Sequence, residues 1–282
     1  MKSLTDKTAL VTGGGSGIGR SLVLALARAG ARIVVADIML DNARAVADHV
    51  EKSGGRAIAV HCDVCDADSL KALKRASDAA FGPVSLLFAN AGATSFEPLN
   101  KMAEHDIDWI MHVNLIGVTR CIKTFLADMV ATGEGHIVAT ASAAGLLPFW
   151  IPYHAPYAAS KAGIIGLMLN LRHELDEAGI GATVLCPFGV ATNMQRDNQR
   201  YRPNRFGGPD PAPVELPGNF FEQAALAFRS PDEVAEMTLR AVRLNRPMVV
   251  TDPSQRENFR QGYVDLVMGA FDDVEAFDRG AS

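Results

Sequence analysis

The stretch Thr12-Gly13-Gly14-Gly15-Ser16-Gly17-Ile18-Gly19 decides the fold, because it lies between a strand-like run and a helical pattern. The run Thr8-Ala9-Leu10-Val11 precedes it, and the segment from Arg20 to Gly30 follows with its apolar residues on one helix face. Glycines at such a turn allow a sharp bend and let the backbone approach a phosphate closely. The helix that follows presents free N–H groups at its N-terminus. The stretch therefore predicts a strand–turn–helix unit that binds the pyrophosphate of a dinucleotide.

The rest of the chain repeats this alternation of short apolar runs and helical patterns. Each apolar run is continuous instead of alternating with polar residues, which indicates burial on both faces of a sheet. This order predicts an α/β fold, with a Rossmann-type doubly wound parallel sheet in a single domain. The further strands are expected at Arg32 to Ala36, Ala57 to His61, Ser85 to Ala89, His136 to Thr140, Thr183 to Cys186 and Met248 to Val250.

Two segments near the end of the chain differ from this pattern. Residues 195–219 are polar and rich in proline, and such a long irregular stretch is typical of a substrate lid. Helical patterning resumes over residues 220–244. We expect residues 1–253 to form the dinucleotide-binding domain, with the lid inserted in it, and residues 254–282 to form a helical tail of the same domain.

The composition excludes several classes of protein. The 282 residues are 48% hydrophobic and 21% charged, which is enough apolar material for a core. A net charge of -5 argues against a nucleic-acid partner. No uncharged apolar run approaches ~20 residues, so no transmembrane helix is expected. The polar start from Met1 to Lys7 does not resemble a signal peptide. We therefore expect a cytoplasmic protein that does not bind a membrane.

The cysteines and histidines do not predict a metal centre. Cys62 and Cys65 form a lone CxxC pair, and no second pair completes a zinc site. The seven histidines show no HxxxH spacing. Ordinary structural positions are favoured over a redox or metal role for the cysteine pair.

Asp37 ends the second strand-like run and follows the glycine turn at the distance expected for a ribose-binding carboxylate. A carboxylate there accepts hydrogen bonds from the adenosine ribose and repels a 2′-phosphate. Ser16 in the turn is not basic, and a helix-surface role is favoured for the nearby Arg20. This pattern predicts NAD rather than NADP as cofactor.

Several motifs in a fixed order resemble the short-chain dehydrogenase/reductase family in its single-domain form. The resemblance extends from Lys7 to about Pro253. The motifs are Thr12-Gly13-x3-Gly17-Ile18-Gly19, Asp63-Val64, Asn90-Ala91-Gly92, Asn114, Ser142, Tyr157-x3-Lys161 and the segment from Pro187 through Thr192.

Four of these residues are the expected catalytic group. Tyr157 and Lys161 lie four residues apart, hence on one face of a helix expected from Ala158 to Ala178. An ammonium group beside a phenol favours the phenolate, which suits Tyr157 for proton transfer near neutral pH. Asn114 interrupts an apolar helical stripe, so a buried amide there either caps a local kink or holds a water. The resemblance implies that Asn114 does both and completes a proton relay through Lys161, and that Ser142 orients the substrate oxygen.

The resemblance also implies the cofactor contacts. Asp63 would accept a hydrogen bond from the adenine, with Val64 packed against it, and Pro187, Val190 and Thr192 would hold the nicotinamide amide. The expected cofactor-binding residues are Gly13, Ser16, Gly17, Ile18, Gly19, Asp37, Ile38, Asp63, Val64, Asn90, Ala91, Gly92, Tyr157, Lys161, Pro187, Val190 and Thr192.

The chain departs from the family pattern on the substrate side. Phe188 follows Pro187 where the family commonly has glycine, so either its ring lines the pocket or the backbone bends one residue later. The aromatic segment 149–154 between Ser142 and Tyr157 is either a pocket wall or plain packing under the helix. The expected substrate-binding residues are Ser142, Trp150, Tyr153, Tyr157, Phe188 and Met194.

Arginines make the first half of the lid basic. For these residues a solvated loop face is favoured over a contact with an acidic substrate or with a neighbouring subunit. The residues are Arg196, Arg200, Arg202 and Arg205.

The expected function is NAD-dependent interconversion of a secondary alcohol and a ketone by hydride transfer, with Tyr157 as acid and base. The aromatic segment and the lid favour a bulky apolar substrate, aryl or steroid-like. The lid pattern looks similar to dehydrogenases of aromatic secondary alcohols in lignin-fragment breakdown. An acyl-carrier 3-ketoacyl reductase is the enzymatic alternative. Asp37 and the long insertion argue against it. A non-catalytic NAD(H)-sensing protein of the same fold is the other alternative, although such a protein would be expected to lose Tyr157, Lys161 or Ser142.

A second apolar face on the helices that carry Asn114 and Tyr157 predicts a homotetramer or homodimer. The residues assigned to this face are Leu126, Met129, Ile165, Leu167 and Leu171.

Overall fold

A seven-stranded parallel sheet forms the centre of the computed structural model, which describes residues 3–149, 151–210, 212 and 228–280. The strand order is β3-β2-β1-β4-β5-β6-β7. The direction of winding therefore reverses between β1 and β4, where open α/β sheets bind their ligands. The strands are β1 (Thr8–Thr12), β2 (Arg32–Asp37), β3 (Arg56–His61), β4 (Leu86–Ala89), β5 (Gly135–Thr140), β6 (Ile180–Cys186) and β7 (Met248–Val250).

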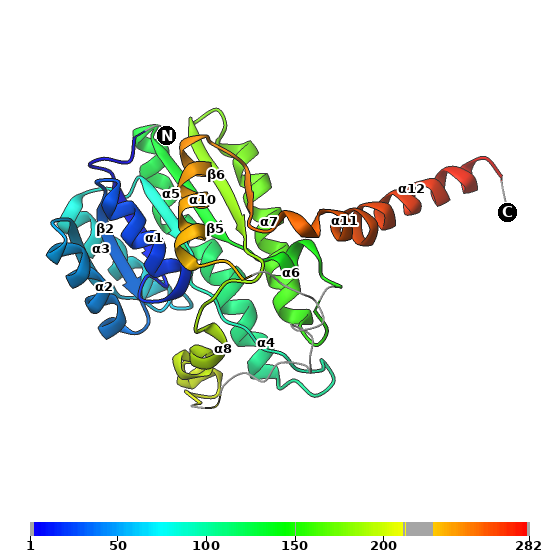
Figure 1. Cartoon of the computed structure of the whole chain (residues 1–282), viewed down its shortest axis with the longest axis horizontal. Helices are drawn as coiled ribbons and strands as arrows, with labels where there is room; N and C mark the ends of the chain where they lie inside the picture. Colours follow the sequence, from blue (N-terminus) through cyan, green and yellow to red (C-terminus); the bar gives the residue numbers. More distant parts are fainter. Residues whose placement is uncertain (1–2, 150, 211, 213–227, 281–282) are drawn as a thin grey trace.

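Helices cover both faces of the sheet (Figure 1). One face packs against α1 (Gly17–Arg28), α2 (Leu40–Lys52) and α10 (Pro231–Arg243). The other packs against α3 (Ala67–Phe81), α5 (Val118–Thr132) and α7 (Ala155–Leu175). The short helices α4 (Glu104–Met111) and α6 (Ala143–Leu146) lie beside α7.

Two separate hydrophobic cores result from the alternation of side chains along each strand. In β1, Leu10 points into the core under α5 and α7, whereas Ala9 and Val11 point into the core under α1 and α10. The predicted doubly wound sheet with burial on both faces is thus confirmed for the inner strands. The edge strands β3 and β7 differ, because several of their residues stay partly exposed where only one neighbouring strand covers them.

Several predicted element boundaries are shifted by one to three residues, those of β6 and α7 among them. β6 begins at Ile180, before the expected start, because Ile180 and Gly181 already pair with Gly135 and His136 of β5. α7 begins at Ala155 with Pro156 in its first turn, a position that suits proline because the first helical N–H groups have no partner within the helix.

The helical stretch Glu104–Thr132 joins α4, the π-helix η1 (His112–Gly117) and α5. It is long and apolar enough to cross a membrane by length and composition alone, which the sequence did not lead us to expect. Its buried side chains, such as Ile110 and Phe125, pack in the core, and this packing accounts for its apolar character.

The residues assigned to a second apolar helix face do not form one surface. Met129 and Leu171 are buried in the core beside the sheet. Leu126, Ile165 and Leu167 are only partly buried, and they too pack against that core. The exposed apolar residues of α5 and α7 are instead Val130 and Leu169.

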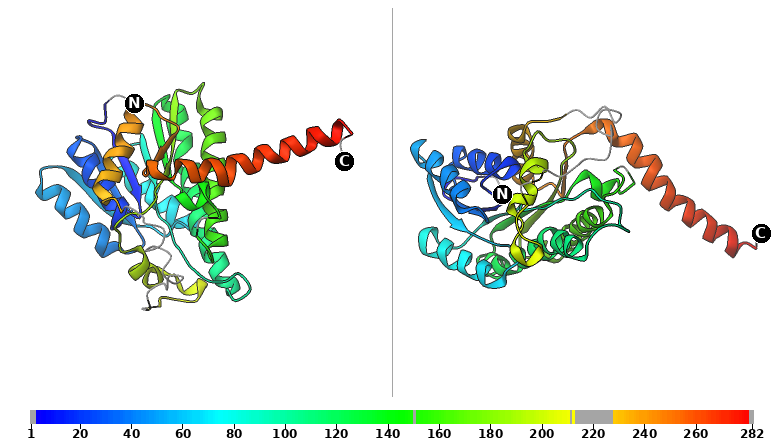
Figure 2. Two further views of the ribbon diagram at one scale, coloured as in Figure 1. Left: turned by 45° about the vertical axis from the view of Figure 1, so that its right-hand side comes forward. Right: turned by 90° about the horizontal axis from the view of Figure 1, so that it is seen from below.

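The C-terminal helices extend away from the body of the protein. α11 (Arg256–Phe259), the π-helix η5 (Arg260–Val264) and α12 (Asp265–Asp278) form one continuous rod, which we call the C-terminal arm. Three views show the arm leaving the sheet and its covering helices and ending far from them (Figures 1 and 2).

Candidate functional site

A cavity of about 380 Å³ lies where the carboxyl ends of the strands meet. Its walls come from the turn between β1 and α1, the loops after β2 to β6, and the segment from Met194 to Pro203. This is the position where parallel α/β sheets bind ligands. Among the described residues, the predicted cofactor and catalytic residues gather around this one cavity.

The glycine turn shapes the wall below the N-terminus of α1. Gly13 and Gly17 have φ values of 63° and 49°, in the left-handed region that favours glycine. A Cβ on Gly19 would lie 2.0 Å from the carbonyl oxygen of Gly13, so only glycine fits there. Gly13, Ser16, Gly17 and Ile18 line the cavity, whereas Gly19 lies behind it and allows the turn to close.

Asp37 lies at the end of the cavity where an adenosine ribose is expected. Its Oδ2 accepts a hydrogen bond from the Gly15 amide at 2.9 Å, and its Oδ1 accepts one from the Met39 amide at 2.9 Å. Burial raises the pKa of Asp37, and these two amides oppose that shift. The carboxylate is thereby held with its remaining lone pairs available to a ligand beside Ile38, which also lines the cavity.

Asp63 and Val64 line the same half of the cavity. The Cys65 amide donates to Asp63 Oδ1 at 2.9 Å, which orients the carboxylate. Arg205 Nη2 approaches Asp63 Oδ2 to 2.6 Å, although 142 positions separate the two residues in sequence. Asp63, which is expected to contact adenine, therefore also binds the lid through Arg205.

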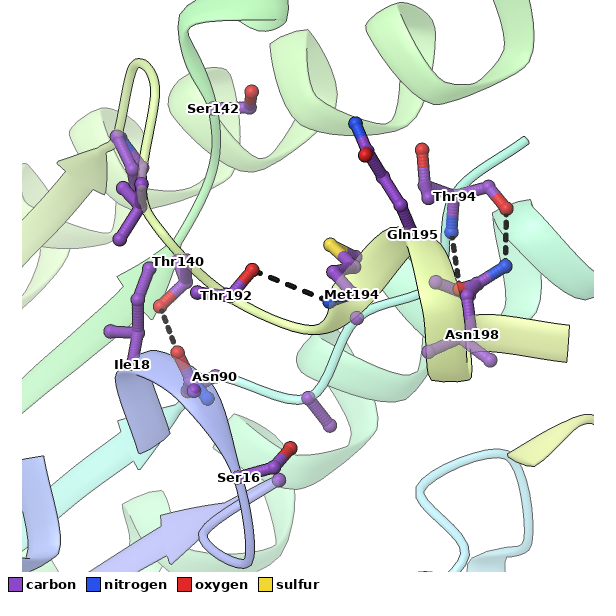
Figure 3. Close-up of a pocket in the computed structure, with 18 of the residues that line it drawn as sticks. Ser16, Ile18, Asn90, Thr94, Thr140, Ser142, Thr192, Met194, Gln195 and Asn198 are labelled. Atoms are coloured by element: carbon purple, nitrogen blue, oxygen red, sulfur yellow. Dashed lines mark hydrogen bonds between the residues drawn. The ribbon is translucent and has the colours of Figure 1, made fainter. Parts of the chain in front are cut away.

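Asn90 holds three strand ends together. Its backbone amide donates to Thr12 Oγ1 at 3.0 Å, and its side-chain amide donates to the Thr12 carbonyl at 3.3 Å. Its Oδ1 accepts a hydrogen bond from Thr140 Oγ1 at 3.0 Å (Figure 3). Asn90 therefore fixes the ends of β1, β4 and β5 at the centre of the cavity, with Ala91 and Gly92 following it along the wall.

Tyr157 and Lys161 project from the first turns of α7 into the cavity, as their spacing predicts. Lys161 Nζ lies 5.5 Å from the centre of the Tyr157 ring and donates to the Thr140 carbonyl at 2.8 Å. Burial lowers the pKa of Lys161 to about 8. Burial raises the pKa of Tyr157, while a hydrogen bond with the Ser142 side chain opposes that rise.

Ser142 begins α6, and its hydroxyl also accepts a hydrogen bond from the Ala144 amide at 3.1 Å. That contact fixes the orientation of the side chain at the carboxyl end of β5. Ser142 and Tyr157 thus present two hydroxyl groups to the same part of the cavity.

Asn114 lies behind the cavity wall, fully buried in the π-helix η1. Its Oδ1 accepts a hydrogen bond from the Ala93 amide at 2.8 Å, and its Nδ2 donates to the Ala93 carbonyl at 2.9 Å. Nδ2 also donates to Ser160 Oγ at 3.1 Å, one residue before Lys161. Asn114 therefore ties the π-helix η1 to the Ala93 backbone and to α7.

The loop after β6 lines the opposite wall with Pro187, Phe188, Val190 and Thr192. The Phe188 amide donates to Thr251 Oγ1 at 3.0 Å, and the Gly189 carbonyl accepts from the Arg229 amide at 3.0 Å. These bonds hold the loop in a path that accommodates phenylalanine. Of the two interpretations of Phe188, the structure supports the one that places it in the cavity lining.

The remaining predicted substrate residues differ in position. Met194 lines the cavity and is held by a hydrogen bond from its amide to Thr192 Oγ1 at 3.4 Å (Figure 3). Tyr153 is half exposed and does not line the cavity. Trp150 lies outside the described residues.

Sequence reasoning missed a buried network on the substrate side. Asn198 accepts a hydrogen bond from the Thr94 amide at 2.9 Å and donates to the Thr94 carbonyl at 2.6 Å (Figure 3). Thr94 Oγ1 in turn lies 3.0 Å from His154 Nε2. His154 stacks on Tyr157 with ring centres 4.1 Å apart, so the lid is linked to the tyrosine through two residues. No local pattern indicates this chain of contacts, because its members come from three distant segments.

Arginines in the first half of the lid form ion pairs with carboxylates of the chain. Arg202 is buried, pairs with Asp106 at 2.5 Å and lies 5.0 Å from the Trp109 ring centre. Arg196 and Arg200 stay exposed and pair with Asp197. The prediction of a solvated basic face is therefore wrong for the buried Arg202, whereas Arg205 stays exposed while it pairs with Asp63. The proline-rich part of the lid, residues 211 and 213–219, lies outside the described residues.

The four cysteines are free and buried. Burial raises the pKa of the Cys62 and Cys65 thiols to about 12, so both resist ionisation. Within the described ranges, no group of three or more His, Cys, Asp or Glu side chains is arranged to hold a metal ion.

Comparisons with known proteins agree with this fold. The C alpha-dehydrogenase of Sphingobium sp. strain SYK-6 is 34% identical over 272 residues, which cover 95% of this chain and 87% of that protein. A 2,5-dichloro-2,5-cyclohexadiene-1,4-diol dehydrogenase of Sphingobium indicum is 37% identical over 196 residues, 69% of this chain and 76% of that one. A crystal structure of a short chain dehydrogenase/reductase from Burkholderia phymatum in complex with NAD matches with a TM-score of 0.87 at 31% identity, covering 95% of this chain and 97% of that one. Residues 7–202 match the family model of the short chain dehydrogenases. The chain therefore belongs to the short-chain dehydrogenase family of oxidoreductases.

Proposed function

We propose that this protein is an NAD-dependent dehydrogenase that interconverts a secondary alcohol and a ketone. The observation that carries the proposal is the arrangement of the cavity. Asp37 lies at one end, and Tyr157, Ser142 and Lys161 lie together at the other. A dinucleotide extended between these ends would bring its reactive ring to the two hydroxyl groups.

The described residues fit NAD on two observations. Any side chain at Gly19 would clash with the Gly13 carbonyl, so glycine keeps the turn tight and brings the N-terminus of α1 to the cavity, where it would face a pyrophosphate. Asp37 supplies a carboxylate whose two oxygens are already oriented by backbone amides. A 2′-phosphate would be repelled by that carboxylate, so NADP fits less well. The bound neighbour from Burkholderia phymatum supports NAD as the cofactor.

Four residues of this chain have separate roles in the proposed reaction. Tyr157 accepts the proton of the substrate hydroxyl in oxidation and returns it in reduction. Ser142 donates a hydrogen bond to the substrate oxygen and so orients it. Lys161 holds the cofactor ribose, and its charge favours the ionised form of Tyr157. Bound NAD would supply the hydride acceptor and a positive charge near Tyr157. Asn114 holds the Ala93 backbone and η1 in place behind Lys161.

The shape of the cavity supports a bulky, largely apolar substrate, aryl or steroid-like. Phe96, Trp109, Val113 and Phe188 supply its apolar wall near Tyr157, together with Met194 from the lid. The names of the two Sphingobium relatives, which describe dehydrogenases of an alcohol carbon and of a cyclic diol, support the same choice. Free buried cysteines are typical of a reducing compartment, which supports a cytoplasmic location.

A spectrophotometric screen at ~340 nm tests this function, because reduced nicotinamide absorbs there and the oxidised form does not. The panel would contain aryl, steroid, sugar and short aliphatic secondary alcohols, each with NAD and with NADP. We expect turnover with NAD on the aryl or steroid class. Silence across the panel, with NAD binding intact in calorimetry, would instead favour a non-catalytic NAD(H)-sensing protein.

A further inference from the structure

The C-terminal arm exposes an unusual amount of apolar surface. No residue of α11, η5 or α12 is buried by the described part of the chain. Phe271 is 62% exposed and Phe277 is 80% exposed, far more than is usual for phenylalanine. The other exposed apolar residues of the arm are Tyr263, Val264, Leu266, Val267, Met268 and Val274.

Three of these apolar residues share one side of the rod. Val267, Phe271 and Val274 follow each other at spacings of four and three, which places them on one helix face. Asp265, Asp272 and Asp273 occupy the opposite face. The arm therefore carries a continuous apolar stripe backed by carboxylates. A stripe of this kind forms on helices that pack against another surface.

The root of the arm is packed against the loop between α6 and α7. The Phe149 ring lies against the backbone of Gly262 in η5, where an added Cβ would come within 2.1 Å of Cζ. Phe149 belongs to the loop that leads to His154 and Tyr157. The arm therefore begins beside the loop that carries Phe149 and leads away from the body of the protein (Figure 2).

Two neighbouring loops of the body, which we call the rim, carry exposed apolar side chains of their own. Leu99 and Tyr153 are both more than half exposed. Their two loops are joined by a hydrogen bond from the Glu97 amide to the Tyr153 carbonyl at 2.8 Å. The stripe on α12 cannot cover this rim in the same chain, because the rigid rod points away from it.

We propose that the apolar stripe of the arm packs on a second copy of this chain, over the rim formed by Leu99 and Tyr153. An isolated helix of 14 residues is only marginally stable in water, so α12 needs a packing partner to stay helical. An anionic lipid surface is a poor partner, because the segment from Asp265 to Arg279 has five carboxylates and one arginine. A second copy supplies an apolar rim that its own arm leaves uncovered.

Two-fold symmetry makes the exchange reciprocal. In an isologous dimer each arm contacts the other copy in the same way, so both rims are covered and the assembly closes. This inference goes beyond the proposed function, and its tests measure assembly rather than turnover.

Light scattering after size exclusion tests the stripe directly. The full chain should run as a dimer or a larger even assembly. The variant Val267→Ser/Phe271→Ser/Val274→Ser should dissociate to half that mass or less at micromolar concentration. The matched control Asp265→Ser/Asp272→Ser/Asp273→Ser changes three residues on the polar face of the same helix and should keep the wild-type mass. A thermal unfolding transition of the body must persist in both variants.

Crosslinking between two differently tagged copies tests the contact. A mixture of Leu99→Cys and Phe271→Cys chains should give a mixed crosslinked dimer with a short bismaleimide, whereas Leu99→Cys with Asp272→Cys should give much less. The four native cysteines are buried and should not compete.

Three results would overturn the proposal. They are a monomeric full chain, an assembly whose mass the stripe variant leaves unchanged, and equal crosslinking through Phe271→Cys and Asp272→Cys. Binding of the monomeric chain to phosphatidylcholine vesicles through the stripe would also overturn it, in favour of a lipid surface.

Discussion

At the scale of single residues, burial opposes the ionisation of both members of the Tyr157–Lys161 pair. It raises the pKa of the Tyr157 phenol and lowers the pKa of the Lys161 ammonium group to about 8. The site therefore needs additional stabilisation of the phenolate. The hydrogen bond from Ser142 and the proximity of Lys161 supply part of it.

Replacing Tyr157 with phenylalanine tests its role as acid and base. We expect kcat to fall by ~10²–10⁴-fold, the usual contribution of a positioned proton-transfer group, with little change in the Kd for NAD. Steady-state kinetics and calorimetry measure the two quantities. The control variant Tyr263→Phe removes a tyrosine hydroxyl from the C-terminal arm and should leave kcat unchanged. Full activity of Tyr157→Phe would exclude this residue as the proton-transfer group.

Replacing Asp37 with serine tests its contact with the ribose. The variant loses charge-assisted hydrogen bonds to NAD and the repulsion of a 2′-phosphate. The preference for NAD over NADP should therefore shift by about tenfold to a hundredfold toward NADP. The ratio of kcat/KM with the two cofactors measures it. Asp41→Ser removes an exposed carboxylate from the start of α2 and should not change the ratio. An unchanged ratio in Asp37→Ser would mean that Asp37 does not contact the ribose.

At the scale of elements, the lid is attached to both halves of the cavity. Arg205 binds Asp63 in the cofactor half, and Tyr201 hydrogen-bonds Asn42 on α2. Arg202 and Asn198 bind α4 and the Thr94 loop in the substrate half. Closure of this segment over one ligand therefore changes the surroundings of the other.

Replacing Arg202 with methionine should release the lid. The change leaves the partly buried Asp106 without its cation, a defect that costs about 3 kcal/mol when a buried ion pair loses one member. Chymotrypsin should then cleave after Phe206 about a hundredfold faster, because proteolysis follows the open population. Arg200→Met removes an exposed arginine that lies 3.7 Å from Asp197, and it should change cleavage little.

A double variant that also removes Asp106 provides a further control. Arg202→Met/Asp106→Leu removes both members of the ion pair, so it should recover most of the resistance to cleavage. If the single and double variants are cleaved equally fast, the ion pair does not hold the lid.

At the scale of the whole molecule, two buried histidines make the fold sensitive to acid. Burial lowers the pKa of both His136 and His154 to about 3. Thr183 Oγ1 donates to the Arg246 carbonyl, so His136 Nε2 must donate to Thr183 at 2.8 Å, which fixes the tautomer of the neutral ring. Above pH ~6.5 both rings are neutral in the folded and unfolded chain, so they add no pH dependence.

Below that pH the unfolded chain binds protons that the folded chain excludes. The free energy of unfolding should fall by about 1.4 kcal/mol per pH unit for each histidine as the pH drops from ~6.5 toward ~3. Urea unfolding at pH 7, 6 and 5 measures this slope. His136→Leu keeps the Thr183 bond to Arg246 and should halve the contribution of the pair. An identical slope in the variant would show that His136 does not carry the acid sensitivity.

The elements follow closely from the sequence because their causes are local. The glycine turn, the strands and the pair Tyr157–Lys161 depend on residues a few positions apart, so periodicity and steric rules suffice to predict them. The position of Asn114 also indicated a local helix distortion, which η1 shows. The predicted burial on both faces fails at β3 and β7, because each of these edge strands has only one neighbouring strand and stays partly exposed.

By itself, then, the sequence determined the doubly wound fold, the glycine turn and the residues of the proposed catalytic group. Only the tertiary structure decided that Arg202 and Arg205 form ion pairs within the chain, that Asn198 and His154 link the lid to Tyr157, and that the C-terminal arm stands apart with its apolar face uncovered. The reason is physical: an arginine in a polar loop looks the same in sequence whether it faces water or a carboxylate more than a hundred residues away. An apolar helix face likewise does not indicate in sequence whether the surface that covers it belongs to its own chain.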